Sequence, residues 1–182
     1  MRKGWFEIPG VQSGFRTQGE QLEGLFDLAN VVRGRRVLDL GCAEGLIAKH
    51  LLAQGATYVL GIDCFGQAIK EARAQCIGLP AHFIRADLNI ARPWIDEQFD
   101  VVLMLAILHK LKDPPALVNE VLRMDPELIV VRLPPHCPGY VRDERSGFQI
   151  HDVAKQIVDS GYTMTEGSGP RDEWIGFFRR RP

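Results

Sequence analysis

Five short runs of apolar, largely β-branched residues recur along the chain, each separated from the next by a segment with helical spacing. The runs occupy residues 36–40, 58–63, 82–85, 99–105 and 127–132. Almost continuously apolar runs are typical of strands that are covered on both faces, and amphipathic helices between them supply the cover. The pattern predicts an α/β fold built on a doubly wound, mostly parallel sheet.

The chain after the fifth run adds a helix and two strands to this prediction. Residues 134–140 are rich in proline and are not expected to form regular structure. A helix is expected near 149–160, followed by strands near 162–165 and 173–179. The short Gly167-Ser-Gly-Pro170 turn between these strands is typical of a hairpin. We therefore expect a seven-stranded sheet with an antiparallel last strand.

Residues 1–34 are expected to form an arm and a leading helix within the same domain as residues 35–182. Apolar side chains share one face across residues 18–33, which predicts a single helix packed against the sheet. Residues 5–17 carry glycine, proline and aromatic residues without periodicity, which predicts a loop or arm.

Composition and charge exclude several classes of protein. Hydrophobic residues make up 46% and charged residues 25% of the chain, as in folded globular proteins. The longest apolar run, from Val101 to Leu108, is too short to span a membrane. No apolar leader precedes Glu7 and Pro9, so a cytoplasmic protein without a membrane partner is expected. A net charge of −1 predicts no binding to duplex DNA.

The four cysteines show neither a C-x-x-C pair nor companion histidines at zinc-binding spacing. This spacing supports neither a metal site nor a disulfide framework, so reduced thiols are expected.

The segment from Val37 to Gly45 carries the strongest local signal. A strand ends at Leu40, and glycine-rich backbone leads into a helix expected to begin near Glu44. Glycine lets the backbone turn sharply and lets a ligand approach with no Cβ in the way. The ligand then lies at the carboxyl edge of the sheet, beside a helix N-terminus. Asp63 ends the second strand and is placed to accept hydrogen bonds from both hydroxyls of a ribose. Together these features indicate an adenosine-containing cofactor.

Glycine spacing distinguishes between two such cofactors. The dinucleotide fingerprint requires glycines at positions 41, 43 and 46, where the chain has glycine only at 41. The stretch resembles motif I of the class I S-adenosylmethionine-dependent methyltransferases, D/E-x-G-x-G-x-G. Asp39, Gly41 and Gly45 match the motif, and Ala43 replaces its middle glycine.

The resemblance continues through residues 61–63, 85–88 and 99–109, and spans roughly residues 36–133. It implies that residues 35–182 form a Rossmann-like domain that binds S-adenosyl-L-methionine and transfers its methyl group without a metal.

The resemblance also implies where the methionine part of the cofactor lies. Asp39 would hold the glycine loop or meet the ammonium group through water. The backbone at Leu105 and Ala106 would take the ammonium group. The loop residues that would line the methionine part are Gly41, Cys42, Ala43 and Gly45.

For the adenosine part, the resemblance assigns Asp63 to the ribose hydroxyls. Cys64 or Phe65 would cover one face of the adenine. Asp87 would accept from the adenine amino group, while the Leu88 amide meets a ring nitrogen.

His109 is the candidate general base. It follows the fourth strand, where substrate-facing residues lie in the resembled family, and small-molecule members often read Leu-His-His-Leu there. This chain reads Leu108-His109-Lys110-Leu111. A neutral imidazole can accept the proton of a hydroxyl as the methyl arrives. The alternative is that His109 caps or packs the following helix.

Two further regions are candidates for contact with the acceptor. Arms before the first helix often fold over the site in this family, which draws attention to Trp5, Phe6, Phe15 and Arg16. The start of the chain also resembles, over a short stretch, the tRNA wobble-uridine carboxymethyl-transferring enzymes. Arg132 either faces the substrate or pairs with an acid at the sheet edge.

Three functions remain open after these observations. The first is an S-adenosylmethionine-dependent methyltransferase that methylates an oxygen or nitrogen atom of a small molecule. The second is an RNA methyltransferase of tRNA type. The third is a catalytically inactive S-adenosylmethionine-binding partner subunit. The acceptor and the oligomeric state are left open.

Overall fold

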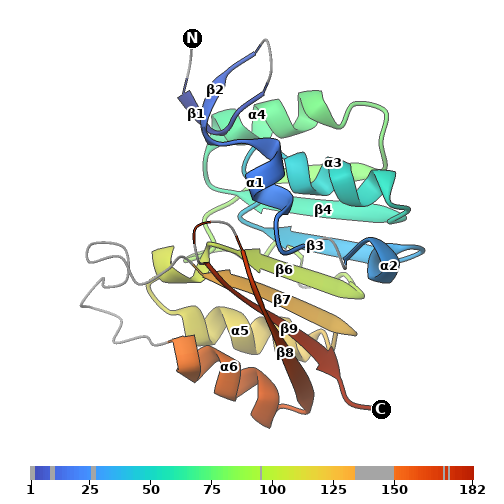
Figure 1. Ribbon diagram of the computed structural model, residues 1–182, viewed down its shortest axis with the longest axis vertical. Helices are drawn as coiled ribbons and strands as arrows, with labels where there is room; N and C mark the ends of the chain where they lie inside the picture. Colours follow the sequence, from blue (N-terminus) through green and yellow to red (C-terminus); the bar gives the residue numbers. More distant parts are fainter. Residues whose placement is uncertain are drawn as a thin grey trace.

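The computed structural model describes residues 3–8, 11–25, 28–94, 96–133, 150–169, 171 and 173–182. Seven strands form one sheet in the order β5-β4-β3-β6-β7-β9-β8 (Figure 1). They are β3 (Arg36–Leu40), β4 (Tyr58–Asp63), β5 (Ala81–Arg85), β6 (Val101–Leu105), β7 (Leu128–Leu133), β8 (Tyr162–Ser168) and β9 (Trp174–Arg180).

The first five strands in this order, β5, β4, β3, β6 and β7, pair in parallel. Strand β9 runs antiparallel to both β7 and β8. The predicted mostly parallel, seven-stranded sheet with an antiparallel last strand is therefore confirmed. The predicted irregular segment 134–140 lies outside the described residues.

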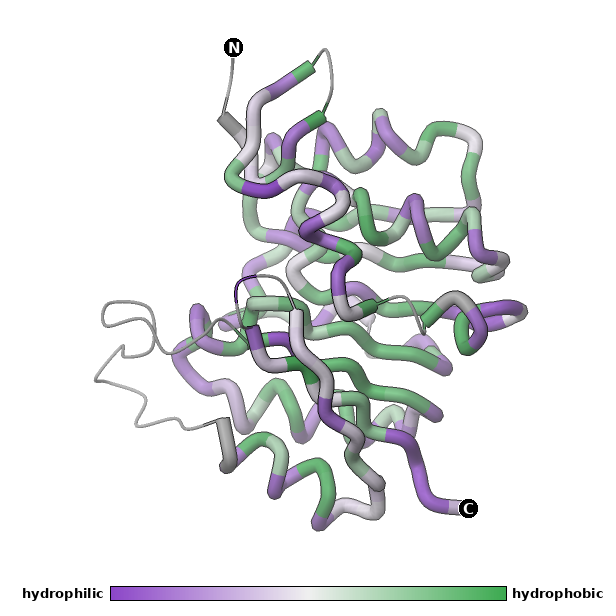
Figure 2. Tube along the Cα trace, viewed as in Figure 1, coloured by the Kyte–Doolittle hydropathy of each residue, from purple (hydrophilic) through white to green (hydrophobic). Residues whose placement is uncertain are grey.

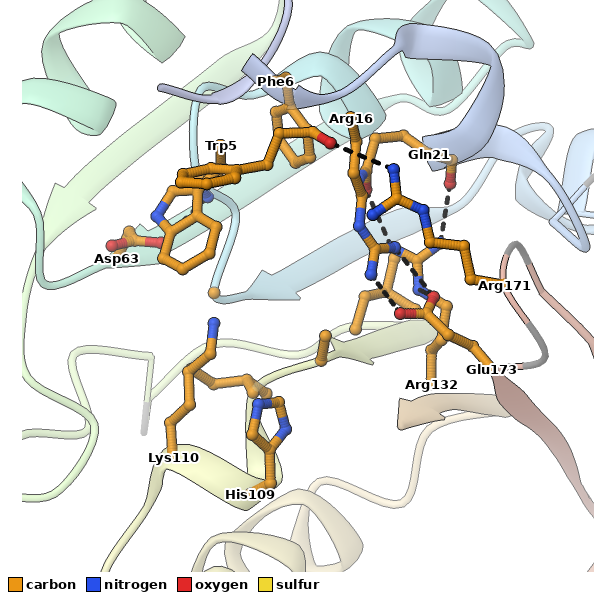
Figure 3. Close-up of a pocket in the computed structure, with 16 residues that line it drawn as sticks. Trp5, Phe6, Arg16, Gln21, Asp63, His109, Lys110, Arg132, Arg171 and Glu173 are labelled. Carbon is orange, nitrogen blue, oxygen red and sulfur yellow. Dashed lines mark hydrogen bonds and ion pairs between the residues drawn. The ribbon is translucent and has the colours of Figure 1, made fainter. Parts of the chain in front are cut away.

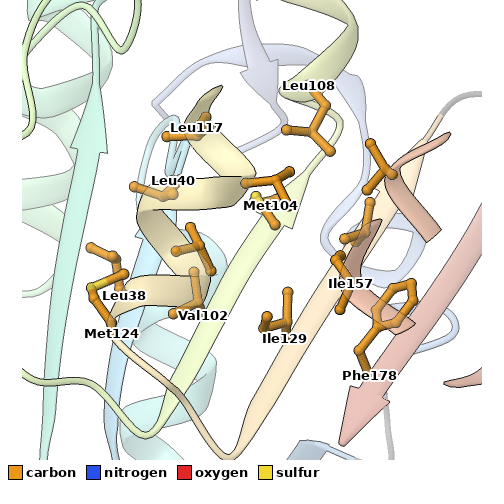
Figure 4. Packing of buried hydrophobic residues seen from close by; sticks show 14 of the residues in the cluster. Leu38, Leu40, Val102, Met104, Leu108, Leu117, Met124, Ile129, Ile157 and Phe178 are labelled. Carbon is orange, nitrogen blue, oxygen red and sulfur yellow. The ribbon is translucent and has the colours of Figure 1, made fainter. Parts of the chain in front are cut away.

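Helices cover both faces of the sheet, as a doubly wound fold requires. Residues of α2 (Leu28–Val32), α3 (Leu46–Ala53) and α4 (Gly66–Gln75) form one buried cluster with one face of the strands. Residues of α5 (Pro114–Arg123) and α6 (Ile150–Asp159) form another with the opposite face, shown in Figure 4. Neighbouring residues Val37 and Leu38 belong to different clusters, because side chains alternate across a strand. The central strands are apolar along almost their whole length (Figure 2).

The predicted single helix over residues 18–33 is wrong. The segment forms two short helices, α1 (Gln18–Leu22) and α2, with a turn between them. Glu23 leaves the helical conformation with a ψ of 131°, and Gly24 has a φ of 75°. A Cβ on Gly24 would lie 2.6 Å from the carbonyl oxygen of Ser168. The apolar stripe of residues 18–33 alone favours a continuous helix. The β8–β9 hairpin approaches so closely at Gly24 that the chain turns there instead.

The predicted amino-terminal loop or arm contains two short strands, β1 (Lys3–Phe6) and β2 (Ser13–Arg16), which pair in parallel. The backbones lie so close that a Cβ on Gly14 would be 1.9 Å from the carbonyl carbon of Phe6. The sequences of these strands, Lys3-Gly-Trp-Phe6 and Ser13-Gly-Phe-Arg16, do not alternate between apolar and polar residues and so carry no strand pattern.

Candidate active site

The carboxyl ends of β3, β4 and β6 meet at one edge of the sheet, and the loops that follow them carry the predicted site residues. After β3 the chain passes through three left-handed residues, Gly41 (φ 83°), Ala43 (φ 45°) and Gly45 (φ 75°). The amides of Gly41 and Cys42 donate to the Ile62 carbonyl at 2.8 and 3.1 Å. These bonds tie the loop to the end of β4.

Gly41 and Gly45 have different roles in this loop. A Cβ on Gly41 would lie 3.2 Å from the Ile107 side chain, at the floor of a cavity. A Cβ on Gly45 would lie 2.9 Å from the Cβ of Ala72 in α4. Gly45 is also the N-cap residue of α3. It allows close packing of helices and does not line the cavity.

Asp63 connects this loop to the cavity. Its Oδ2 accepts a hydrogen bond from the Ala43 amide at 3.0 Å, and its Oδ1 accepts from the Phe65 amide at 2.9 Å. A carboxylate oxygen has two acceptor directions, so each oxygen retains one for a further donor. The Asp63 side chain thus positions the loop and lines the cavity at the same time.

Asp39 lies beneath the loop on β3, opposite Gly61 of β4 and Leu103 of β6. It is only 2% exposed, and its Oδ2 has no hydrogen-bond partner among the described residues. Burial and, to a smaller extent, the nearby Asp63 carboxylate raise the pKa of Asp39 to about 7, against a lowering effect of Arg132.

A cavity of about 510 Å³ opens at this edge of the sheet, between the glycine loop and the amino-terminal arm (Figure 3). Its lining includes six of the predicted site residues: Gly41, Ala43, Asp63, Leu105, Ala106 and His109. The other lining residues are Trp5, Phe6, Phe15, Arg16, Gln21, Ile107, Lys110, Arg132, Arg171 and Glu173.

The remaining predicted residues lie around the cavity without lining it. Asp39 and Cys42 are buried below the loop, and Cys64 and Phe65 are exposed beside Asp63. Asp87 accepts hydrogen bonds from the backbone and side-chain nitrogens of Asn89, both at 2.9 Å, which lowers its pKa. The Leu88 side chain is buried in the core.

The end of β6 carries the candidate base. Ala106 has a φ of 57°, and its amide donates to the Arg132 carbonyl at 2.7 Å. A 3₁₀ helix (Leu108–Lys110) follows and places His109, half-buried, at the cavity. Burial and the charge of Lys110 lower the pKa of His109 to about 4, against a raising effect of Glu173. The imidazole is therefore neutral at pH 7.

Glu44 attaches the amino-terminal arm to the glycine loop, residues 41–45. The buried Glu44 side chain accepts hydrogen bonds on Oε1 from the Trp5 amide at 2.9 Å and from Gln12 Nε2 at 3.2 Å. Phe6 packs with Ala43 and Leu46 in a small buried cluster. These contacts hold the arm over the site, as expected from the sequence.

Opposite the glycine loop, the wall of the cavity is built around Glu173, whose side chain is fully buried. Arg16 donates to both of its oxygens, and Arg132 Nε lies 3.4 Å from its Oε2. Arg132 also donates to the backbone and side-chain oxygens of Gln21, both at 2.9 Å. Of the two alternatives for Arg132, the structure shows the pairing with an acid at the sheet edge, and the residue also lines the cavity.

Sequence reasoning missed five cavity residues: Gln21, Ile107, Lys110, Arg171 and Glu173. Glu173 reaches this edge because β9 is antiparallel and therefore starts where β7 ends. Within the described ranges, no group of three or more His, Cys, Asp and Glu side chains is arranged to hold a metal ion. No helix in the described part of the chain is long and apolar enough to cross a membrane.

Comparison with known proteins found a matching family model, similar curated proteins and similar solved structures. Residues 38–125 match the family model described as a methyltransferase domain. A ubiquinone biosynthesis O-methyltransferase of Neisseria meningitidis is 34% identical over 106 residues, covering 55% of this chain and 42% of the relative. A tRNA U34 carboxymethyltransferase of Alteromonas mediterranea is 30% identical over 145 residues, covering 72% of this chain and 43% of the relative. The chain spans less than half the length of these curated relatives.

Solved structures share the fold over most of the chain. An S-adenosylmethionine-dependent methyltransferase from Mesorhizobium loti gives a TM-score of 0.68 at 19% identity, with 89% of this chain and all of the other (100%) covered. A magnesium protoporphyrin IX methyltransferase from Synechocystis, solved with bound S-adenosylmethionine, gives 0.67 at 17% identity, covering 90% of this chain and 80% of the other.

Proposed function

Because the chain belongs to the class I S-adenosylmethionine-dependent methyltransferases, we propose that it transfers a methyl group from this cofactor to an oxygen or nitrogen atom of a small molecule. One observation carries the proposal: the left-handed loop after β3, the Asp63 carboxylate and His109 line the same cavity. A cavity of about 510 Å³ has the size of a small-molecule site.

The residues at this edge fit S-adenosylmethionine. Gly41 leaves open a surface that a side chain would fill, and Asp63 retains acceptor directions for two ribose hydroxyls. The buried Oδ2 of Asp39, which has no hydrogen-bond partner in the described part of the chain, lies below the place proposed for the methionine ammonium group. A cation there offsets the cost of burying this carboxylate. We assign Ala43, Leu105 and Ala106 to the methionine part.

The adenine is assigned to the segment beyond Asp63. Phe65 is 57% exposed and available to cover one face of the ring. Asp87 and the Leu88 amide are assigned to its polar edge, and Cys64 to its surroundings. Cys42 and Gly45 support the loop from below, through burial and helix packing.

The bound cofactor supplies an electrophilic methyl group, so the protein mainly has to align the acceptor with it. We assign His109 to hold the acceptor hydroxyl and to take its proton as the new bond forms. Its pKa of about 4 keeps the imidazole unprotonated at pH 7, although it also makes His109 a weaker base than an ordinary histidine. An acceptor whose own oxygen is acidic suits such a base.

An RNA acceptor is the second candidate, because the tRNA U34 carboxymethyltransferase of Alteromonas mediterranea matches 72% of this chain. The cavity of about 510 Å³ has the size of a small-molecule site and favours the small molecule.

The two acceptors are separated by offering methyl-tritiated S-adenosylmethionine together with a cell extract below 1 kDa and, separately, with total tRNA. Label in the small-molecule fraction supports the proposal, and label in tRNA supports the second candidate. Calorimetric titrations with S-adenosylhomocysteine and NAD accompany the assay. Binding of S-adenosylhomocysteine without transfer to either fraction favours an inactive binding subunit, and binding of NAD in its place overturns the assignment.

A further inference from the structure

The ionisable side chains that line the cavity are mostly basic. Among the described residues that line the cavity, Arg16, Lys110, Arg132 and Arg171 face two carboxylates, Asp63 and Glu173. His109 adds no charge at pH 7, because its pKa is lowered to about 4. The cavity as a whole is therefore suited to an anionic ligand.

The two carboxylates that line the described part of the cavity, Glu173 and Asp63, already have partners. Arg16 and Arg132 both contact Glu173, and Arg171 pairs with Glu20 at 2.9 Å. Asp63 accepts its two hydrogen bonds from backbone amides. Lys110 differs from the three arginines, because no carboxylate lies within 4.0 Å of its ammonium group in the described part of the chain.

The ring of Trp5 lies over this lysine, and Phe15 lies beside Trp5. Its Nζ lies 4.4 Å from the centre of the Trp5 ring, a cation–π contact, and Trp5 lies 5.9 Å from Phe15 at an interplanar angle of 43°. Both rings line the cavity and are exposed, at 37% and 55%. Figure 3 shows Lys110 pointing toward Trp5, on the same side of the cavity as His109. Exposed rings beside an ammonium group form a surface for a planar anion.

We propose that the methyl acceptor is a small aromatic molecule that carries an anionic oxygen group, and that Lys110 selects it by pairing with this group. The inference rests on the proposed function and names the class of its substrate. The ring lies against Trp5 and Phe15, and the anionic group lies at Lys110. The same ammonium group stabilises the negative charge of a phenolic acceptor oxygen, which offsets the weak basicity of His109.

The experiment uses benzoate, phenyl phosphate and the neutral analogue benzamide as probes. Each is titrated into protein saturated with S-adenosylhomocysteine, and binding is followed by two-dimensional ¹H–¹⁵N NMR. The indole signal of Trp5, identified from a Trp5→Phe variant, reports on the proposed surface. We expect at least one anion to bind at least ten times more tightly than benzamide. Benzoate and phenyl phosphate distinguish a carboxylate from a phosphate as the preferred group.

Three variants test the role of Lys110. In Lys110→Met the preference is expected to fall below threefold, and in Lys110→Arg it is expected to persist. Lys112→Met removes the same charge from an exposed position outside the cavity and is expected to change nothing. Equal binding of anions and amide by the wild type, or an unchanged preference in Lys110→Met, would overturn the inference. S-adenosylhomocysteine affinity, measured first in every sample, reports separately on the proposed function.

Discussion

Asp39→Asn is expected to change how the stability of the unliganded protein depends on pH. The carboxyl has a pKa of about 7 in the folded chain against an ordinary value of 3.8, chiefly because it is buried. Folding raises this pKa, so the protonated carboxyl contributes to the free energy of unfolding. This contribution is complete below pH 3.8 and is lost as the pH rises through 7. The wild type should therefore lose free energy of unfolding across this range, and the neutral asparagine should not lose this contribution.

The size of the effect follows from the two pKa values. Linkage gives a loss of about 2–3 kcal/mol between pH 5 and pH 8 for a shift of this size. The measured quantity is the difference in free energy of unfolding between Asp39→Asn and wild type, from urea titrations at both pH values. Groups that titrate alike in both proteins cancel in this difference. It should rise by about 2–3 kcal/mol from pH 5 to pH 8.

Asp96→Asn serves as the control, because Asp96 is exposed and lies outside the cavity. Its difference from wild type should be the same at both pH values. The difference in free energy of unfolding between Asp39→Asn and wild type could also prove equal at both pH values. Burial would then not destabilise the Asp39 carboxylate in the unliganded protein, and the argument for a cationic partner above it would fail.

Three further predictions test separate parts of the site. Gly41→Ala and Gly34→Ala both place alanine at a φ of about 75–83°, so each should lower the free energy of unfolding by about 1–2 kcal/mol. Only the alanine at position 41 meets Ile107, so only Gly41→Ala should weaken S-adenosylhomocysteine binding at least tenfold. Equal affinities in the two variants would mean that the loop is only a turn. Glu44→Ala should lower the free energy of unfolding by about 1–3 kcal/mol and Glu44→Gln by less than half as much, and equal losses in urea titrations would exclude the proposed hydrogen bonds. His109→Ala should lower kcat by about two to four orders of magnitude with unchanged cofactor affinity, and wild-type turnover would exclude His109 as the base.

Much of the fold was predictable because the central strands are buried on both faces. Residues 36–40 and 58–63 form strands with the predicted bounds, since continuous apolar runs leave few alternatives. The helix over residues 18–33 was mispredicted because a tertiary contact decides the conformation of Gly24. Its stripe of apolar residues is real, but Ser168, far along the chain, occupies the space beside the turn.

The candidate site was predictable where its residues follow one another along the chain. Gly41 and Asp63 belong to local strand–turn patterns, and both line the cavity. Glu173 belongs to no such pattern. It reaches Arg16 across 157 positions, because the antiparallel course of β9 brings its first residues to the active edge. Lys110 was visible only as a departure from a histidine pair, and its place beside Trp5 depends on the folding of the arm.

The central claim is that the edge formed by β3, β4 and β6 binds the adenosyl cofactor through Asp63. Its most direct test is a calorimetric titration of S-adenosylhomocysteine into wild type, Asp63→Ala and Asp100→Ala. Asp100 accepts the Arg36 amide at 2.7 Å just before β6 and does not line the cavity, so it matches Asp63 as an acceptor of a backbone hydrogen bond. We predict that Asp63→Ala weakens binding by about 1–3 kcal/mol, roughly 5- to 150-fold, and that Asp100→Ala leaves the affinity of the folded protein unchanged. Wild-type affinity in folded Asp63→Ala would contradict the account.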